Sequence, residues 1–117
     1  MTPNLTQGIA ATPPPPYYAV IFTSVRTEKD FSGYDAMAVK MVELAAAQPG
    51  FLGTESVRDG LGITVSYWES LEAIAAWKRN AEHRVAQQRG NAEWYAAYRL
   101  RICKVERDYG SQFDPKS

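Results

Sequence analysis

Few residues of this chain could do acid–base or metal chemistry. His83 is the only histidine, and it follows Trp77 by six positions. A lone imidazole can act as a base or a hydrogen bonder, but it cannot build a multi-histidine metal site. Cys103 is the only cysteine, and its place on a predicted strand favours a buried structural role over a nucleophilic one. The sequence therefore predicts a function that needs few ionisable groups.

Several standard motifs are absent from the sequence. The Gly60-Leu61-Gly62 segment lacks the third glycine of a dinucleotide-binding loop, and it lies between two predicted strands instead of opening a helix. No phosphate-binding loop is present, and nothing resembles a Ser-His-Asp arrangement. The sequence gives no support to a dinucleotide site or a catalytic triad.

Aromatic side chains are the remaining candidates for a binding site. The chain has seven tyrosines and three tryptophans, many of them in its second half. Rings at regular spacing usually pack in a core, so core packing stays an alternative for each of them. A pocket between sheet and helices, lined by such rings, would suit a flat aromatic ligand. The candidate rings are Tyr67, Trp68, Trp77, Trp94, Tyr95 and Tyr98.

His83 has two interpretations, a surface or structural hydrogen bond and a place in this pocket. Along an unbroken helix its position lies about 120° around the axis from Trp77, so a turn or kink would have to bring both side chains together. Arg99 and Arg101 share one strand face with Cys103, and they could pair with interface carboxylates or with a ligand.

Charge and cysteine content limit the partners and the compartment. The 13 basic residues balance the 13 acidic ones, and no basic block is visible, so we expect no nucleic-acid partner. No apolar run approaches the about 18 residues of a membrane span, and we find no basic-then-apolar leader. A single cysteine cannot form an internal disulfide, which fits a reducing compartment. We therefore expect a cytoplasmic protein that does not enter the membrane.

The first half of the chain alternates strand and helix signals. Tyr17–Arg26 is rich in aromatic and β-branched residues and predicts a strand with two apolar faces. Phe51–Arg58 and Ile63–Trp68 predict a hairpin that turns at Asp59-Gly60. Between the first strand and this hairpin, apolar residues at helical spacing predict an amphipathic helix that Pro49-Gly50 ends. These apolar residues are Tyr34, Met37, Ala38, Met41, Leu44 and Ala45.

The second half predicts helix and then strand. Ser70 is a favourable N-cap, and Glu72 in the first turn suits the helix dipole. The apolar side of this helix carries Leu71, Ile74, Ala75 and Trp77. Ala81–Ala97 predicts further helix, broken near Gly90, with Trp94 and Tyr95 as apolar anchors. Tyr98–Tyr109 alternates as a long last strand.

This β-α-β-β-α-β order predicts an α+β fold, a ferredoxin-like sandwich with helices on one face of an antiparallel sheet. Residues 17–109 form the domain, 110–117 a C-terminal tail, and 1–16 a disordered proline-rich tail. A partner-binding proline motif stays an alternative for 1–16. The second sheet face would be too apolar for water, so we expect a homodimer that covers it. The residues assigned to that face are Ile21, Thr23, Val25, Thr64, Ser66, Cys103 and Val105.

The segment PGFLGTESVRDGLGITVSYWESLEAIAAWKRNAEH resembles the antibiotic biosynthesis monooxygenase superfamily, the dimeric α+β barrel proteins. The resemblance covers roughly Tyr17 to Tyr109 and is most like small uncharacterised bacterial members. It is more specific for the fold than for an activity, because these barrels serve several unrelated functions.

One branch of the superfamily oxidises polycyclic anthrone-type phenols to quinones with dioxygen, without metal or flavin. By resemblance we expect such a cofactor-independent monooxygenase here, with His83 and Trp77 as catalytic residues. Tyr67, Trp68, Ser24 and Thr23 would bind the substrate, a small aromatic phenol. The alternative is a non-catalytic dimeric module that binds an aromatic or lipid-like metabolite or assists a stress pathway.

A second branch binds and degrades haem, using an asparagine on the first strand and a tryptophan and a histidine on the second helix. Trp77 matches that tryptophan. The asparagine position falls on Ser24 or Thr23, and the histidine position falls on Gln87, whereas His83 comes too early. One of three residues is retained, so we expect no cofactor and keep haem as a second alternative.

Overall fold

Strand β1 (Tyr17–Arg26) lies inside a four-stranded sheet, between β3 (Leu61–Trp68) and β4 (Tyr95–Val105). Strand β2 (Phe51–Asp59) pairs with the other side of β3, which gives the order β2-β3-β1-β4. All three pairings are antiparallel. The computed structural model describes residues 8–26, 42–88 and 95–110, with the backbone alone at 26, 82–88 and 95–96.

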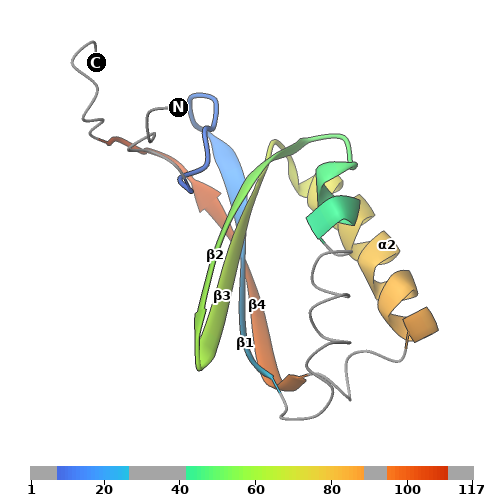
Figure 1. Cartoon of the computed structure of the whole chain (residues 1–117). Coiled ribbons are helices and arrows are strands. Elements are labelled where there is room, and N and C mark those ends of the chain that lie inside the picture. Colours follow the sequence, from blue (N-terminus) through green and yellow to red (C-terminus); the bar gives the residue numbers. More distant parts are fainter. Residues whose placement is uncertain (1–7, 27–41, 89–94, 111–117) are drawn as a thin grey trace, which may run out of the picture.

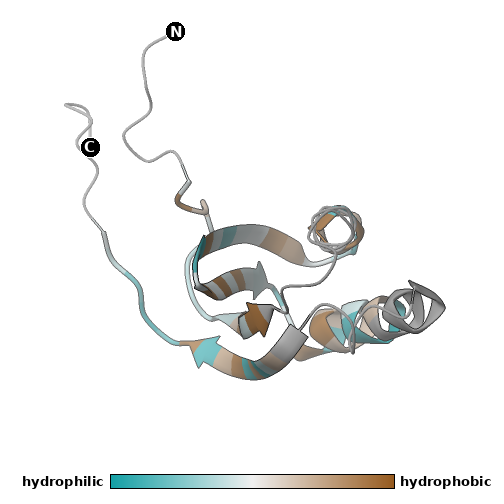
Figure 2. Ribbon diagram, turned by 60° about the horizontal axis from the view of Figure 1, so that its bottom comes forward, coloured by the Kyte–Doolittle hydropathy of each residue, from teal (hydrophilic) through white to brown (hydrophobic). Residues whose placement is uncertain are grey.

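Helix α2 (Leu71–Gln88) and the helical residues 42–46 lie on the same side of the sheet (Figures 1 and 2). Their apolar side chains meet the sheet in one buried cluster that comprises Val20, Ala45, Trp68 and Ile74. Asn80 of α2 also donates a hydrogen bond from Nδ2 to Gln48 Oε1, at 3.3 Å. We call the covered side of the sheet the helix face and the opposite side the outer face. The predicted ferredoxin-like α+β fold is confirmed.

The strand register assigns each residue of β1 to a face. Opposed residues of paired strands share a face, and successive residues alternate. Tyr18 is opposite Trp68 and Val20 is opposite Ser66, so the even-numbered residues of β1 lie on the helix face and the odd-numbered ones on the outer face. Thr64 and Ser66 therefore lie on the helix face, and their predicted assignment to the uncovered face is wrong. Ile63 and Val65 take those places.

Local signals in the sequence set the turns and the helix start. Gly60 has a φ of 78° and joins β2 to β3, as the Asp59-Gly60 pair predicts. Gly50 has a φ of 87°, and a Cβ there would lie 2.7 Å from the Ala73 Cβ, so only glycine lets this turn approach α2. Ser70 caps α2, since its Oγ accepts a hydrogen bond of 3.1 Å from the Ala73 amide.

The end of α2 and the start of β4 differ from the prediction. Helix α2 runs without a break to Gln88, and β4 begins at Tyr95. Tyr95 and Ala97 pair with Arg26 and Val25 of β1, so the predicted helix over 81–97 is wrong at its C-terminal end. Backbone pairing with the end of β1 outweighs the local helical pattern there. Strand β4 ends at Val105, four residues before Tyr109.

Other predictions fall partly outside the described residues. Of the first predicted helix, residues 34, 37, 38 and 41 lie outside them, whereas Ala45 is in the core. Gly90 and Trp94 lie outside them as well. Within the proline-rich N-terminal segment, the Ala10 amide donates to Glu55 Oε2 at 2.9 Å. None of the helices in the described ranges is long and apolar enough to cross a membrane.

Candidate functional site

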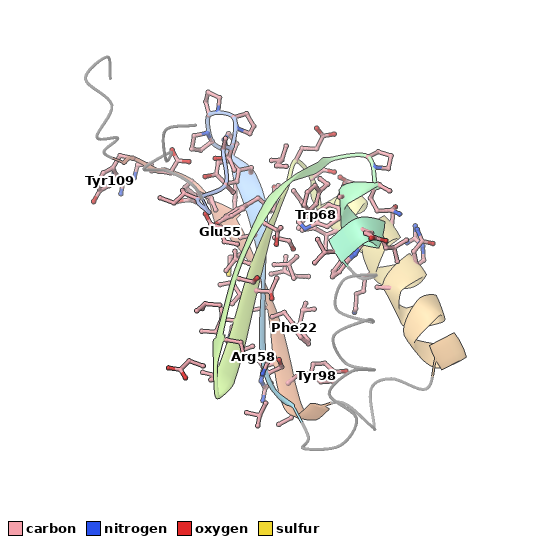
Figure 3. The ribbon with its side chains drawn as sticks, viewed as in Figure 1. Phe22, Glu55, Arg58, Trp68, Tyr98 and Tyr109 are labelled. Carbon is pink, nitrogen blue, oxygen red and sulfur yellow. The ribbon has the colours of Figure 1, made fainter. Side chains whose placement is uncertain are left out.

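Two tryptophans meet where α2 crosses the helix face. The rings of Trp68, from β3, and Trp77, from α2, lie with centroids 5.5 Å apart and planes inclined by 37°. Trp68 is fully buried, and Phe51 packs edge-on against it at 5.4 Å. Figure 3 shows the Trp68 side chain on the side of the sheet where α2 lies. The predicted aromatic site residues Trp68 and Trp77 are therefore brought together.

The two indole N–H groups have different environments. Trp68 Nε1 donates to Ser66 Oγ at 2.9 Å. Trp77 Nε1 is buried, and it has no hydrogen-bond acceptor among the described residues. A buried donor without a protein acceptor carries a desolvation cost of about 1–3 kcal/mol, which a ligand acceptor would remove. Trp77 is thus the member of the pair that is suited to bind a ligand, whereas Trp68 packs against it from β3.

A polar and aromatic group lies toward the other end of the helix face. Ser24 is almost completely buried, and its Oγ accepts a hydrogen bond from Arg58 Nη2 at 2.8 Å. The ring of Phe22 contacts that of Tyr98, with centroids 5.5 Å apart. Phe22, Arg58 and Tyr98 lie below Trp68 in the view of Figure 3, and Ser24 is an even-numbered residue of β1, on the helix face. Ser24 therefore belongs to the same face as the tryptophan pair.

Tyr67 and Thr23 lie on the outer face, away from the tryptophans. Tyr67 donates to Glu55 Oε1 at 2.6 Å, and its ring packs edge-on against Tyr17 at 5.9 Å. Burial, and next the hydrogen bond to Glu55, raise the pKa of Tyr67. Thr23 is opposite Ile63, also on the outer face. Neither residue shares a face with Trp68 and Ser24.

His83 lies in the last third of α2, where the structure describes the backbone alone. Because α2 is continuous, the turn or kink that would align His83 with Trp77 does not occur. The Cα positions of the two residues are therefore separated by about 120° around the helix axis. The side chain of His83 lies outside the part of the chain that the structure describes, so its place in the site stays a prediction.

Cys103 is exposed on β4 in this single chain, so its predicted burial is wrong here. Arg99 and Arg101 are also exposed, and they pair with Thr23 and Ile21 on the outer face. They do not reach the helix face. Within the described part of the chain, no group of three acidic, histidine or cysteine residues could hold a metal ion.

The sequence analysis did not assign Arg58 to the site, and it named Tyr98 only as one of the candidate aromatic rings. Strand alternation could have separated Tyr67 from Trp68 and Thr23 from Ser24, because consecutive strand residues point to opposite faces. Nothing local marks Arg58, since the register of β2 depends on the irregularity between Phe51 and Gly53.

Comparison with known proteins identifies relatives of this chain. The profile of the family described as "Antibiotic biosynthesis monooxygenase" matches residues 16–89. The uncharacterised protein YqjZ of Bacillus subtilis is 55% identical over 101 residues, which cover 85% of this chain and 88% of YqjZ.

Solved structures of low sequence identity share the fold. SnoaB of Streptomyces nogalater, a cofactor-independent oxygenase, superposes with a TM-score of 0.67 at 9% identity, covering 83% of this chain and 100% of SnoaB. MhuD, solved with two manganese protoporphyrin IX molecules per active site, superposes with a TM-score of 0.60 at 21% identity, covering 80% of this chain and 99% of MhuD.

Proposed function

We propose that this chain, which belongs to the antibiotic biosynthesis monooxygenase family, binds a flat aromatic phenol on the helix face and oxidises it with dioxygen without a cofactor. The observation that carries the proposal is the buried Nε1–H of Trp77, which lacks an acceptor among the described residues. An oxygen atom of an aromatic ligand would accept this hydrogen bond while its rings pack against the tryptophan pair.

The proposed reaction needs little from the protein. An anthrone-type methylene loses a proton to give a carbanion that the fused rings stabilise, and the carbanion gives its electrons to dioxygen. Conversion of CH2 to C=O removes four electrons, and dioxygen takes up four; one oxygen atom ends in the carbonyl and the other in water. The protein would orient the substrate and exclude water. His83 is the proposed acceptor of the first proton.

The test uses 1,8-dihydroxyanthrone as substrate and an oxygen electrode as detector. We expect the protein to accelerate oxygen uptake above the uncatalysed rate, with one dioxygen consumed per quinone formed. Trp77→Phe keeps an aromatic side chain, with a phenyl ring in place of the indole, and removes the N–H. We expect it to raise KM or lower kcat by about tenfold. Arg79→Gln, an exposed change on α2, is the matched control and should leave the rate unchanged.

The outcomes separate the proposed functions. Binding of the anthrone without accelerated oxygen uptake would favour the non-catalytic module. Absence of binding would overturn the proposal. A His83→Ala variant that binds normally but has lost turnover supports His83 as the base, whereas unchanged turnover removes His83 from the site.

The residues of this chain fit haem poorly. The asparagine position of the haem-degrading branch falls on Ser24 or Thr23, and the Oγ of Ser24 already accepts a hydrogen bond from Arg58 Nη2. Gln87 stands at the position of the histidine. A haemin titration followed at the Soret band checks this point, and a saturable shift that His83→Ala abolishes would make haem the ligand.

We also propose that the chain acts as a homodimer in the cytoplasm. Proteins of this family are typically dimeric. The outer face carries exposed apolar side chains, with Val57 66% and Val25 43% exposed. Glu55 lies toward one edge of this face, on β2, and Arg101 at the other edge, on β4. A two-fold arrangement could pair these opposite charges around an apolar centre.

A further inference from the structure

We propose that Arg58 and Ser24 form the polar end of the binding site and that Arg58 binds a carboxylate group of the aromatic ligand. This inference rests on the proposed function, because it names the substrate class of the same site. The proposed ligand is thus an elongated aromatic acid, with its rings toward Trp77 and its carboxylate toward Arg58.

The strand register places the guanidinium on the correct face. Arg58 of β2 is opposite Gly62 of β3, and Gly62 is opposite Ser24 of β1. These three residues form one row across the sheet, so they share the helix face. Arg58 crosses the width of β3 to donate from Nη2 to Ser24 Oγ at 2.8 Å. The charge therefore lies over the interior of the sheet and not at its edge.

Gly62 makes this path available. A Cβ built at Gly62 would meet Nη2, Cζ and Nε of Arg58 before any other atoms. The guanidinium thus lies directly on the glycine, in the space that any other side chain would fill. Gly62 has no positive φ, so close approach and not backbone conformation is the reason for glycine here.

Arginine is an unusual residue for the covered face of a sheet, since charged side chains are seldom buried without a specific role. Ser24 is 2% exposed, and Arg58 is half-buried. A guanidinium presents planar N–H donors that match the two oxygens of a carboxylate. The Ser24 hydroxyl orients this group, and a partly dry setting strengthens its attraction for an anion.

Aromatic side chains lie beside the cation. Tyr98 is opposite Ser24 on β4, and its ring contacts that of Phe22. Figure 3 shows Phe22, Arg58 and Tyr98 at the same end of the sheet. From Val20, in the core, to Ser24 is four residues of strand, about 13 Å. This span is comparable to the length of a three-ring aromatic acid, so rings and carboxylate could contact both ends at once.

The test compares two probes that differ only in charge, anthraquinone-2-carboxylate and anthraquinone-2-carboxamide, by calorimetric titration of the full chain. We expect the wild-type protein to bind the carboxylate at least about tenfold more tightly. Arg58→Gln should reduce this preference to less than about twofold and leave the affinity for the carboxamide unchanged. The ratio of the two affinities is the readout, because general loosening of the site would affect both probes alike.

Gly62→Ala gives an independent test that keeps every charge. Its methyl group would displace the guanidinium from β3, so we expect the same loss of preference even if Arg58→Gln fails to fold. Arg79→Gln, at an exposed position on α2, is the matched control and should keep the preference. Equal affinities in the wild type, or a preference that survives both Arg58→Gln and Gly62→Ala, would overturn the inference alone. Failure of the wild type to bind either probe would overturn the proposed function and this inference together.

Discussion

Trp77 of α2 packs against Trp68 of β3, with ring centroids 5.5 Å apart. Of these two side chains, only Trp68 has an acceptor for its indole N–H among the described residues. The same side-chain type thus occurs twice in one contact with two different roles. Trp68 is hydrogen-bonded within the core, whereas the buried indole N–H of Trp77 has no acceptor among the described residues.

The two tryptophans should therefore differ in their effect on stability. Trp68→Phe removes the hydrogen bond to Ser66 and opens space in a fully buried position, so we expect a loss of about 2 kcal/mol. Trp77→Phe removes a donor that has no acceptor in the described structure, and we expect a loss below about 1 kcal/mol. Urea denaturation followed by far-UV circular dichroism measures both. A larger loss for Trp77→Phe would contradict these roles.

The N-cap of α2 gives a second stability prediction. Ser70→Ala removes the acceptor of the Ala73 amide, and we expect a loss of about 1 kcal/mol. Ser70→Asp keeps a capping oxygen and serves as the control, with a change below about 0.5 kcal/mol. Thermal unfolding of the two variants, measured side by side, checks this; equal melting temperatures for both would argue against the cap.

Gly50 and Gly60 form a matched pair that separates backbone strain from steric overlap. Both have positive φ, but a Cβ at Gly60 has no neighbour within 4 Å, whereas one at Gly50 would lie 2.7 Å from Ala73 Cβ. We expect Gly60→Ala to cost about 1 kcal/mol, the conformational term alone. Gly50→Ala should cost clearly more, since α2 must also shift. Similar unfolding free energies for the two variants would show that the overlap relaxes freely.

The proposed dimer predicts that Val57→Glu yields monomers. Val57 is 66% exposed in the single chain, so a glutamate there should not unfold the monomer. Analytical ultracentrifugation of the wild type should give about twice the 13.1 kDa of one chain, and Val57→Glu should give the single-chain mass. Leu71→Glu, at a half-exposed position on α2, is the control and should stay dimeric. A wild-type monomer at micromolar concentration would rule out the dimer.

Two tyrosines on the outer face predict a loss of stability in alkali. The hydrogen bond from Tyr17 to Asp108 raises the pKa of Tyr17, and burial raises the pKa of Tyr67. Each hydroxyl stays protonated in the folded state at a pH where it ionises in the unfolded chain. The stabilisation is therefore complete below about pH 10 and is lost as the pH rises above it. Urea denaturation between pH 8 and 11 measures the slope, which Tyr67→Phe should make shallower.

The sequence contained the information for most of the fold, because its strongest signals are local. The aromatic and β-branched run over Tyr17–Arg26 matches β1, and Gly60 turns the hairpin. Ser70 caps α2 through an oxygen that needs only its own helix. Such signals depend on residues within a few positions of one another, and they can be recognised without tertiary structure.

The extent of β4 could not be read in the same way. Residues 95–97 carry a helical pattern, but they extend because the end of β1 offers them backbone partners. The pairing partner is about 70 positions away in the sequence, so no local window contains it.

For the candidate site, the sequence by itself determined which residue types are present, among them one histidine and three tryptophans. It also carried a family resemblance that the comparison confirmed. Only the tertiary structure decided which of them meet. In the folded chain Trp77 packs against Trp68, and Tyr67 lies on the outer face. The side chain of Arg58 passes over Gly62 and donates a hydrogen bond to Ser24. The physical reason is that a strand exposes its residues to alternate faces. The register between distant strands, which backbone hydrogen bonds fix only in the folded chain, selects the residues that share one face.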